Sequence, residues 1–168
     1  MKRLILTLAI VLGVVATAAA QNYAVVNSEK IFKSIDKYNQ AIEQLDKMAS
    51  EYQKQVDAKF EEVEKIYNAY MSRRTQLSEA SQQANEQNIL NKEREAQQFQ
   101  ESIFGTDGKL LQERLALIQP IQKMVFETIE KYAKQKGFDM IIDIAQNATM
   151  LYYSERADHT EAIIQMLK

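Results

Sequence analysis

The stretch "EKYAKQKGFDMIIDIAQNATMLYYSERADHTEAIIQMLK", residues 130–168, decides the fold, because a long helical pattern stops there. Gly137 follows the lysine-rich "KYAKQK", and cations followed by a glycine are typical of a helix C-terminus. Residues 138–144 then alternate as a strand does, "AQNA" predicts a turn, and residues 149–154 predict the partner strand. The sequence therefore predicts that a helical chain ends in a small β structure.

One more helix is expected after these strands. Asp158, with Glu161 three positions later, resembles a capping box, and Thr160 is the rival cap. The apolar residues of this helix are Ala162, Ile163, Met166 and Leu167. Their spacing predicts that one face of the helix packs against the strands.

The long helical pattern upstream begins with another short strand. "NYAVVN", residues 22–27, is rich in β-formers, and Ser28 can cap a helix that starts there. Apolar residues then recur at alternating steps of four and three, which is the spacing of a coiled-coil seam. The seam positions are Ile31, Ile35, Tyr38, Ile42, Leu45, Ala49, Tyr52, Val56, Lys59, Val63, Ile66, Tyr70, Arg73 and Leu77. One helix of about 70 Å is expected over residues 29–75.

We expect the chain to turn near residue 77 and to return as a second helix that ends near residue 136. Ser78 followed by Glu79 is typical of a helix N-terminus, where a carboxylate meets the positive end of the dipole. In an antiparallel hairpin, residues equally far from residue 77 face each other. The return helix is polar over residues 80–98 and apolar beyond them, which predicts a thin tip and a well-packed root.

Three residues are expected to make the arm flexible. Gly105 and Gly108 each disfavour a helix by ~1 kcal/mol relative to alanine, so a bend or local loosening is expected there. Pro120 lacks an N–H and is expected to kink the helix or to start a new segment. The facing rule places Pro120 opposite Ser34.

Residues 1–20 have the features of a secretory signal peptide. They combine a basic start, an apolar run from Leu4 to Val15 and small residues before Gln21. The run is shorter than the ~20 residues of a membrane-spanning helix, which is the alternative. We therefore expect cleavage after Ala20, no transmembrane segment in the mature chain, and export to the periplasm if the source is a Gram-negative bacterium.

Charge and cysteine content exclude other classes. Removal of Lys2 and Arg3 changes the formal charge from −2 to −4, and an acidic chain is a poor binder of nucleic acid. The sequence has no cysteine, so no disulfide is expected. Few glycines, a single proline and abundant Gln, Glu, Lys and Ala favour long helices over a loop-rich enzyme.

Three strands and one small helix make a marginal core for one chain, and their open edges need a cover. Self-association would supply it, so we expect residues 21–28 and 137–168 to form a β-rich oligomerisation body. Residues 29–136 would form a helical arm. The predicted fold class is mainly α with a small β body, in which a long antiparallel helical hairpin projects from a β-strand hub. The body residues singled out are Val25, Val26, Phe138, Met140, Ile142, Ile144, Leu151 and Tyr153.

These features together resemble the Skp/OmpH family of periplasmic chaperones. The resemblance rests on "YAVVNSEKIF" at the start and on residues 137–168 at the end, with Gly137, Asp139, Asn147 and Tyr153 at the matching positions. It implies a homotrimer with arms around a cavity, acting as an ATP-independent holdase for unfolded outer-membrane proteins. Members often have basic arms, whereas this chain is acidic, which argues against lipopolysaccharide binding.

One flank of the outgoing helix carries apolar residues outside the seam. Phe60, Tyr67 and Met71 lie there, and Met48 and Phe32 extend it. An adaptable surface rich in methionine and aromatic residues suits the binding of unfolded chains. Met48, Phe60, Tyr67 and Met71 are therefore candidate client-binding residues. The alternative is that they only widen the packing of the hairpin.

No catalytic constellation is visible, so no enzyme activity, cofactor or metal is expected. His159 is the single histidine and is expected at the surface beside a helix cap. Asp139 and Asp143 are expected to face solvent on one side of a strand. A second hypothesis is a secreted coiled-coil spacer of the cell envelope. It explains the seam and the signal peptide, but not why strands at opposite ends of the chain should meet.

Overall fold

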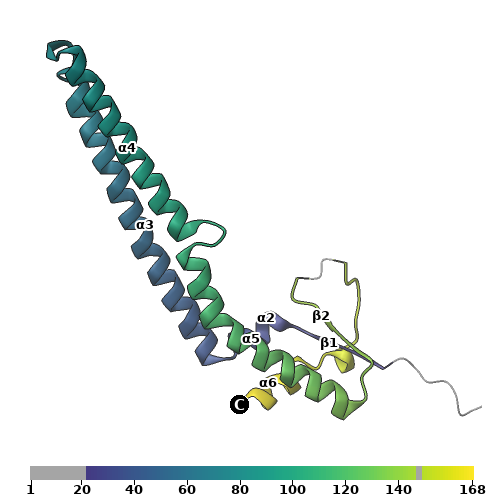
Figure 1. The fold of residues 1–168 in the computed structure, drawn as a ribbon. Helices are drawn as coiled ribbons and strands as arrows, with labels where there is room; N and C mark the ends of the chain where they lie inside the picture. The colour runs from purple at the N-terminus through teal and green to yellow at the C-terminus, as the bar shows by residue number, and fades with distance from the viewer. Residues whose placement is uncertain (1–21, 147–148) are drawn as a thin grey trace, which may run out of the picture. The chain divides into compact units, whose positions relative to one another are not determined.

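The computed structural model describes residues 22–146 and 149–168. The expected signal peptide, residues 1–20, and Asn147 of the expected turn lie outside this part. The elements in chain order (Figure 1) are β1 (Tyr23–Val26), α2 (Ser28–Lys33), α3 (Asp36–Met71), η1 (Arg74–Gln76), α4 (Glu79–Phe104), α5 (Lys109–Lys136), β2 (Met140–Asp143), η2 (Glu155–Ala157) and α6 (Thr160–Leu167).

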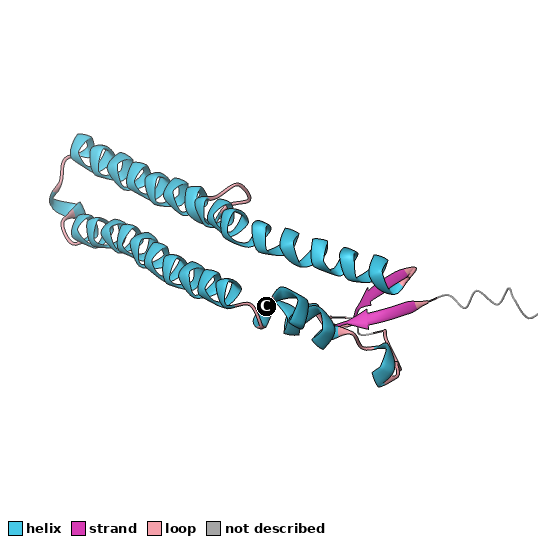
Figure 2. Ribbon diagram, turned by 90° about the horizontal axis from the view of Figure 1, so that it is seen from below, coloured by secondary structure: helices cyan, strands magenta, loops and turns pink. Residues whose placement is uncertain are grey.

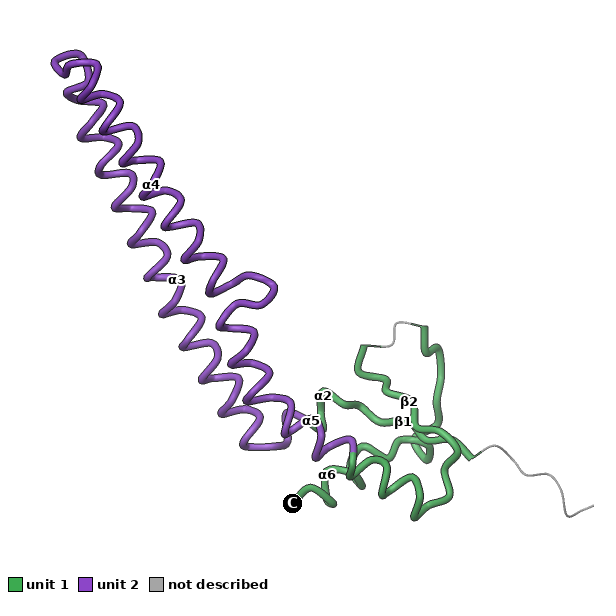
Figure 3. Tube along the Cα trace, in the orientation of Figure 1, with its two compact units in different colours: residues 1–31, 127–168 green, residues 32–126 purple. Residues whose placement is uncertain are grey.

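The chain forms two compact units (Figure 3). The sheet unit contains the described residues up to Ile31 together with Glu127–Lys168, and the hairpin unit is Phe32–Phe126. Helix α5 contributes to both units, since residue 127 lies within it. The predicted fold class, mainly α with a long antiparallel hairpin and a small sheet, is confirmed.

In the hairpin unit, α3 runs antiparallel to α4 (Figure 2). The seam is confirmed at Leu45, Val56 and Tyr70, which are buried, while Ala41 is buried although it lies one residue before the seam position Ile42. Across the hairpin, Lys92 Nζ lies 3.2 Å from Glu62 Oε1, as a tip near residue 77 predicts. The apolar spacing alone thus predicted which face of α3 packs against the return helix.

The outgoing helix is broken where the sequence predicted one continuous helix. Helix α2 ends at Lys33, and α3 begins at Asp36 after Ile35, whose backbone is extended at φ −97° and ψ 112°. The Asn39 side chain donates to the carbonyl of Lys33 at 2.8 Å. This hydrogen bond satisfies a carbonyl at the end of α2, so the chain can change direction there.

The tip is closed by polar contacts. Ser78 caps α4 as predicted, and its Oγ accepts a hydrogen bond from the N–H of Ser81 at 3.3 Å. The hydroxyl of Tyr70 donates to Glu86 Oε1 at 2.6 Å, which joins the last turns of α3 to α4. Arg74 adds an ion pair to the same carboxylate at 3.8 Å.

The return helix is interrupted at the predicted glycines. Helix α4 ends at Phe104 and α5 starts at Lys109. A Cβ on Gly108 would clash with the carbonyl of Ile103, so the loop requires glycine there. The loop adds residues without advancing along the helix axis, so the facing positions beyond it change.

The register beyond this loop differs from the prediction. Ile118 and Ile121 form a buried cluster with Ala41 and Leu45, so the segment around Pro120 faces this part of α3 rather than Ser34. The partly buried residues around the cluster are Phe32, Ile35, Tyr38, Ile42, Leu110 and Leu117. Pro120 does not start a new segment, because α5 continues through it. Proline within a helix costs about 3 kcal/mol, which packing at this cluster offsets.

The sheet unit contains a parallel pair, with Tyr23 opposite Met140 and Val26 opposite Asp143. On the other side of β1, Val25 bridges to Asp158, and the N–H of His159 donates to the carbonyl of Val25 at 2.9 Å. Strand β1 therefore has neighbours on both edges and is buried along most of its length. Within the described residues, β2 pairs with β1 alone.

The predicted partner strand at residues 149–154 is not present in the described chain, and β2 pairs instead with the distant β1. The side chains of Leu151 and Tyr152 are 95% and 82% exposed. The second edge of β1 is met by Asp158 and His159 rather than by residues 149–154. The alternation over residues 138–144 thus correctly indicated a strand, but the predicted hairpin with residues 149–154 was wrong.

The ends of α5 and α6 are partly as expected. Gly137 follows α5 with φ 70°, the left-handed conformation that was predicted. The N-cap position of α6 is His159, but Asp158 Oδ1 accepts a hydrogen bond from the N–H of Thr160 at 2.9 Å and so serves the first turn from one residue earlier. Thr160 is instead buried, and its hydroxyl accepts a hydrogen bond from the N–H of Asn27 at 2.9 Å. This hydrogen bond links the residue after β1 to the first residue of α6. Thr160 therefore joins two segments rather than serving as the N-cap.

Candidate functional site

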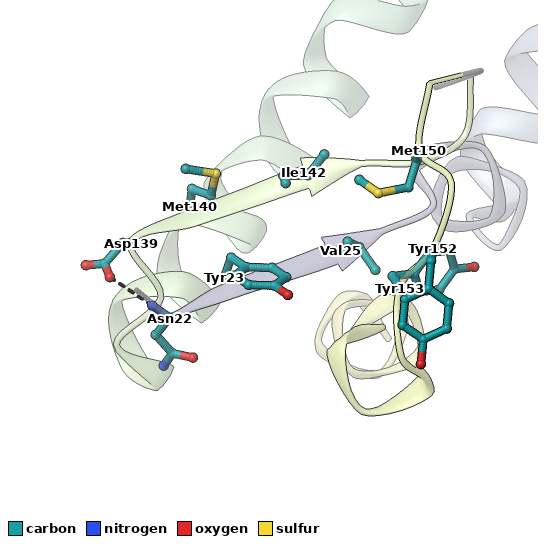
Figure 4. A pocket seen from close by; sticks show the side chains of 9 residues that line it. All are labelled: Asn22, Tyr23, Val25, Asp139, Met140, Ile142, Met150, Tyr152 and Tyr153. Carbon is teal, nitrogen blue, oxygen red and sulfur yellow. Dashed lines mark hydrogen bonds between the residues drawn. The ribbon is translucent and has the colours of Figure 1, made fainter. Parts of the chain in front are cut away.

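A cavity of about 440 Å³, here called the sheet cavity, lies on one face of the two strands (Figure 4). Parallel register brings Tyr23 and Val25 beside Met140 and Ile142 on that face. The chain after β2 supplies a further wall. The lining residues are Asn22, Tyr23, Val25, Asp139, Met140, Ile142, Met150, Tyr152 and Tyr153. The cavity is therefore mostly apolar, and its polar groups gather at the start of the strands.

That polar end fixes where the strands begin. The N–H of Asn22 donates to Asp139 Oδ2 at 3.0 Å, and the N–H of Asp139 donates to the carbonyl of Asn22 at 2.7 Å. The Asn22 side chain also donates to the carbonyl of Gly137 at 3.2 Å. Asp139 was expected only to face solvent. Its carboxylate in fact accepts a hydrogen bond from the backbone of Asn22.

The residues expected in an oligomerisation body divide into a buried, an exposed and a half-buried set. Val25 and Val26 are buried within the chain itself. Met140 is 54% exposed and Tyr153 39% exposed, and Leu151 is almost wholly so. Phe138, Ile142 and Ile144 are half-buried. The first set stabilises the single chain, and the exposed set leaves apolar surface around the sheet cavity.

Asp143 connects the end of β2 to the start of α2. Its carboxylate accepts hydrogen bonds from the N–H of Ser28 and the N–H of Ala145, both at 3.0 Å, and from the hydroxyl of Ser28. Partial burial raises the pKa of Asp143, but these hydrogen bonds outweigh it and leave the pKa lowered. Asp143 therefore acts as a cap for α2 supplied from the far end of the chain.

His159 is half-buried, although a surface position was expected. Its Nδ1 lies 2.7 Å from the hydroxyl of Tyr132, and its ring is 4.8 Å from that of Phe138. Burial raises the pKa of Tyr132. Tyr132, Phe138 and His159 come from three different segments, so no spacing in the sequence could have revealed this aromatic cluster.

The arm residues expected to bind clients do not form one stripe. Phe60, Tyr67 and Met71 share a flank of α3, because their separations are close to whole numbers of helical turns. The exposed fractions of Tyr67 and Met71 are 47% and 46%, while Phe60 is half-buried. Met48 lies about a third of a turn away from this flank. Phe32 is in α2 and packs on the cluster at the root of the hairpin.

Two further hollows lie on the hairpin unit. One, of about 290 Å³, lies beside the interruption and is lined in part by Leu45, Phe104 and Leu110. The other, of about 500 Å³, lies along α5 and includes Leu115 and Pro120. Gly105, Gly108 and Pro120, singled out as flexible points, thus each lie in or beside an apolar hollow.

A family model described as "Outer membrane protein (OmpH-like)" matches residues 22–167. The chain belongs to this OmpH-like family. A crystal structure of an OmpH-like protein from Caulobacter crescentus CB15, described as a candidate outer membrane chaperone, has a TM-score of 0.66 and 11% identity, covering 89% of this chain and 85% of that chain. At this identity the likeness shows the fold alone. Comparison with curated proteins finds no match.

The described part of this OmpH-like chain contains no group of three or more His, Cys, Asp or Glu residues that could hold a metal ion. Over residues 22–146 and 149–168, no helix is long and apolar enough to cross a membrane. The candidate surfaces described above are apolar ones. They are the sheet cavity, the flank of α3 and the hollows of the hairpin unit.

Proposed function

We propose that this OmpH-like protein is an ATP-independent periplasmic holdase, which binds unfolded outer-membrane proteins in a cavity between the arms of a homotrimer. The observation that carries the proposal is the family match over residues 22–167. The likeness in fold to a candidate outer membrane chaperone agrees with it. Periplasmic location rests on the expected signal peptide, residues 1–20, and lipopolysaccharide binding is not proposed because the chain is acidic.

The surface around the sheet cavity supports self-association. Leu151, Tyr152 and Met140 are exposed there, and one edge of β2 has no partner strand within the described chain. Exposed apolar patches and open edges of this kind are typically covered in oligomers. A trimer built through this surface would carry three hairpins, as the proposed cavity between arms requires.

Binding in that space needs many weak contacts rather than one tight pocket. The exposed side chains of Tyr67 and Met71 supply apolar contacts. The ion pairs Lys47–Glu43 and Lys65–Glu61 keep the rest of the α3 surface hydrated. Loose apolar contacts hold an unfolded chain without fixing its conformation. Release would follow when the client folds elsewhere, so no nucleotide is required.

The test is suppression of aggregation of a urea-unfolded outer-membrane β-barrel when it is diluted into buffer with the protein. We expect suppression near one trimer per barrel, and a solution mass of a trimer by light scattering. A protein that never suppresses aggregation, even in molar excess, would contradict the holdase function. A monomer or an elongated dimer would contradict the trimeric cavity.

A triple variant separates the holdase from the envelope spacer. Replacing Phe60, Tyr67 and Met71 by serine should weaken barrel binding and leave the solution mass unchanged. The matched control replaces polar residues of the same helix, Gln53, Glu64 and Asn68, by serine, and should bind as the wild type does. A spacer would show no difference between the two variants.

A further inference from the structure

One apolar side chain of the sheet unit has almost no contact with its own chain. Leu151 is 95% exposed, the highest fraction among the exposed large apolar residues of the described chain. Its neighbours Met150 and Tyr152 both line the sheet cavity (Figure 4), whereas Leu151 does not. The segment therefore forms a wall of the cavity with the residues on either side of Leu151 and leaves Leu151 itself in solvent.

The sheet cavity is an open apolar space that this side chain would fit. Tyr23 and Met140 line it and are 56% and 54% exposed. Methionine side chains adapt their shape to an apolar group that packs against them. An apolar cavity of about 150 Å³ accepts a benzene-sized group. The sheet cavity, at about 440 Å³, therefore has room for a leucine side chain.

Leu151 cannot fill the cavity of its own chain. Moving it inward would displace Met150 and Tyr152, and both belong to the wall. The occupant must therefore come from another molecule. If a client segment filled the cavity, Leu151 would stay in water. A second copy of the chain covers both apolar surfaces at once, because each copy carries one exposed leucine and one cavity.

Strand β2 favours the same occupant. Two of its residues, Met140 and Ile142, line the cavity, and within the described chain β2 has a partner strand on one edge only. The open edge lets the backbone of another chain approach the cavity closely. Two strands and one small helix also make a marginal core, so the sheet unit gains stability when its apolar surface is covered.

We propose that Leu151 of one copy inserts into the sheet cavity of a neighbouring copy, so that each cavity is completed by a residue of another chain. The inference rests on the proposed homotrimer and names the contact that builds it. In a closed ring each copy gives one leucine and receives one, which covers both surfaces in every copy.

The first test removes the inserted side chain. Leu151→Ser leaves the single chain intact, because the side chain is 95% exposed there. Burial of a leucine should strengthen each contact by about ten- to hundredfold. The protein concentration at which the assembly half dissociates, measured by light scattering over a dilution series, should therefore rise by at least about tenfold. Leu90→Ser, which removes a leucine 52% exposed on α4, is the matched control and should leave this concentration unchanged. Equal values for wild type and Leu151→Ser would overturn the proposal.

A cysteine pair tests which residues meet. The sequence has no cysteine, so every disulfide comes from an introduced residue. Leu151→Cys chains and Met140→Cys chains, made with different masses, are unfolded and refolded together and then mildly oxidised. A disulfide needs Cα atoms within about 7 Å, so a product with one chain of each kind places position 151 at the cavity of another copy. We expect this product, and none from either variant alone. Glu161→Cys, at an exposed position of α6 outside the cavity, replaces Met140→Cys as the control and should not crosslink.

The other outcomes separate this contact from the proposed function. If Leu151→Cys crosslinks with itself, the leucines of different copies meet one another, and the proposal is wrong. If wild type is a trimer but the mixture gives no mixed product, the proposal is wrong while the trimer stands. A wild type that is monomeric at every concentration overturns both. A mixed product from a protein that fails to suppress barrel aggregation would support the contact and contradict the holdase function alone.

Discussion

The sheet unit and the hairpin unit are stabilised in different ways. In the sheet unit, single contacts join residues far apart in the chain, as between Asn27 and Thr160 or between Ser28 and Asp143. In the hairpin unit, the seam repeats along α3, and its surface carries charged pairs one turn apart, such as Lys47 with Glu43. The sheet unit thus depends on particular residues, whereas the hairpin unit depends on a pattern.

This difference has consequences for stability and for function. A repeated seam tolerates the loss of one member, because neighbouring turns keep the helices together. A small sheet with one buried helix has no such reserve. The hairpin can therefore vary its surface for client binding, while the sheet unit has little freedom to change.

The largest effect is expected for Ile163→Ala in α6, whose side chain is fully buried in the sheet unit. Loss of such a side chain leaves a cavity and should lower the free energy of unfolding by about 2–5 kcal/mol. The comparable change in the hairpin is Val56→Ala at a buried seam position, with an expected loss of about 1 kcal/mol because neighbouring turns of the seam remain. Urea unfolding at one fixed protein concentration measures both, since self-association adds to stability. Equal losses would contradict the contrast between the two units.

A smaller effect is expected for Asp143→Asn, at about 1 kcal/mol near neutral pH, because its carboxylate is largely exposed. The folded-state pKa of Asp143 is lowered, since hydrogen bonds from Ser28 and Ala145 outweigh the effect of burial. The charge therefore stabilises the fold above the unfolded pKa of about 3.9, and this contribution is lost as pH falls through the folded pKa.

The measurement for Asp143→Asn is urea unfolding from pH 7 to pH 3. The difference between wild type and variant should shrink at the acidic end. Asp46→Asn, at an exposed position of α3, is the control and should change stability little at either pH. A difference that stays constant with pH would show that the charge of Asp143 is not what holds α2.

The contrast between the units also explains what the sequence could predict. The seam of α3, the cap at Ser78, the glycine interruption and the stop at Gly137 are local patterns, and the structure confirms each of them. Strand pairing is not local. The sequence predicted that residues 149–154 would pair with residues 138–144, but β2 pairs with β1, and a local pattern does not show which segments will pair.

The same limit applies to the candidate sites. The flank formed by Phe60, Tyr67 and Met71 follows from helix periodicity, and the same periodicity, applied strictly, excludes Met48 from it. The sheet cavity and the surroundings of His159 bring together segments from both ends of the chain. The break at Ile35 had no strong signal, because neither glycine nor proline marks it.

The smallest effect is expected at the tip of the hairpin, where Tyr70→Phe removes the hydrogen bond from the hydroxyl to Glu86. That hydrogen bond is also the main cause of the raised pKa of Tyr70. The ring stays in place and buried, so the midpoint of urea unfolding should not change. Amide hydrogens of the last turn of α3 and the first turns of α4 should exchange a few-fold faster, since a contact between the two helices is lost. Glu86→Gln, which keeps an acceptor for the hydroxyl, is the matched control and should change exchange less. If Tyr70→Phe instead lowers the unfolding midpoint of the whole protein, the tip is coupled to the rest of the chain, and the hairpin is not the tolerant, repetitive unit described above.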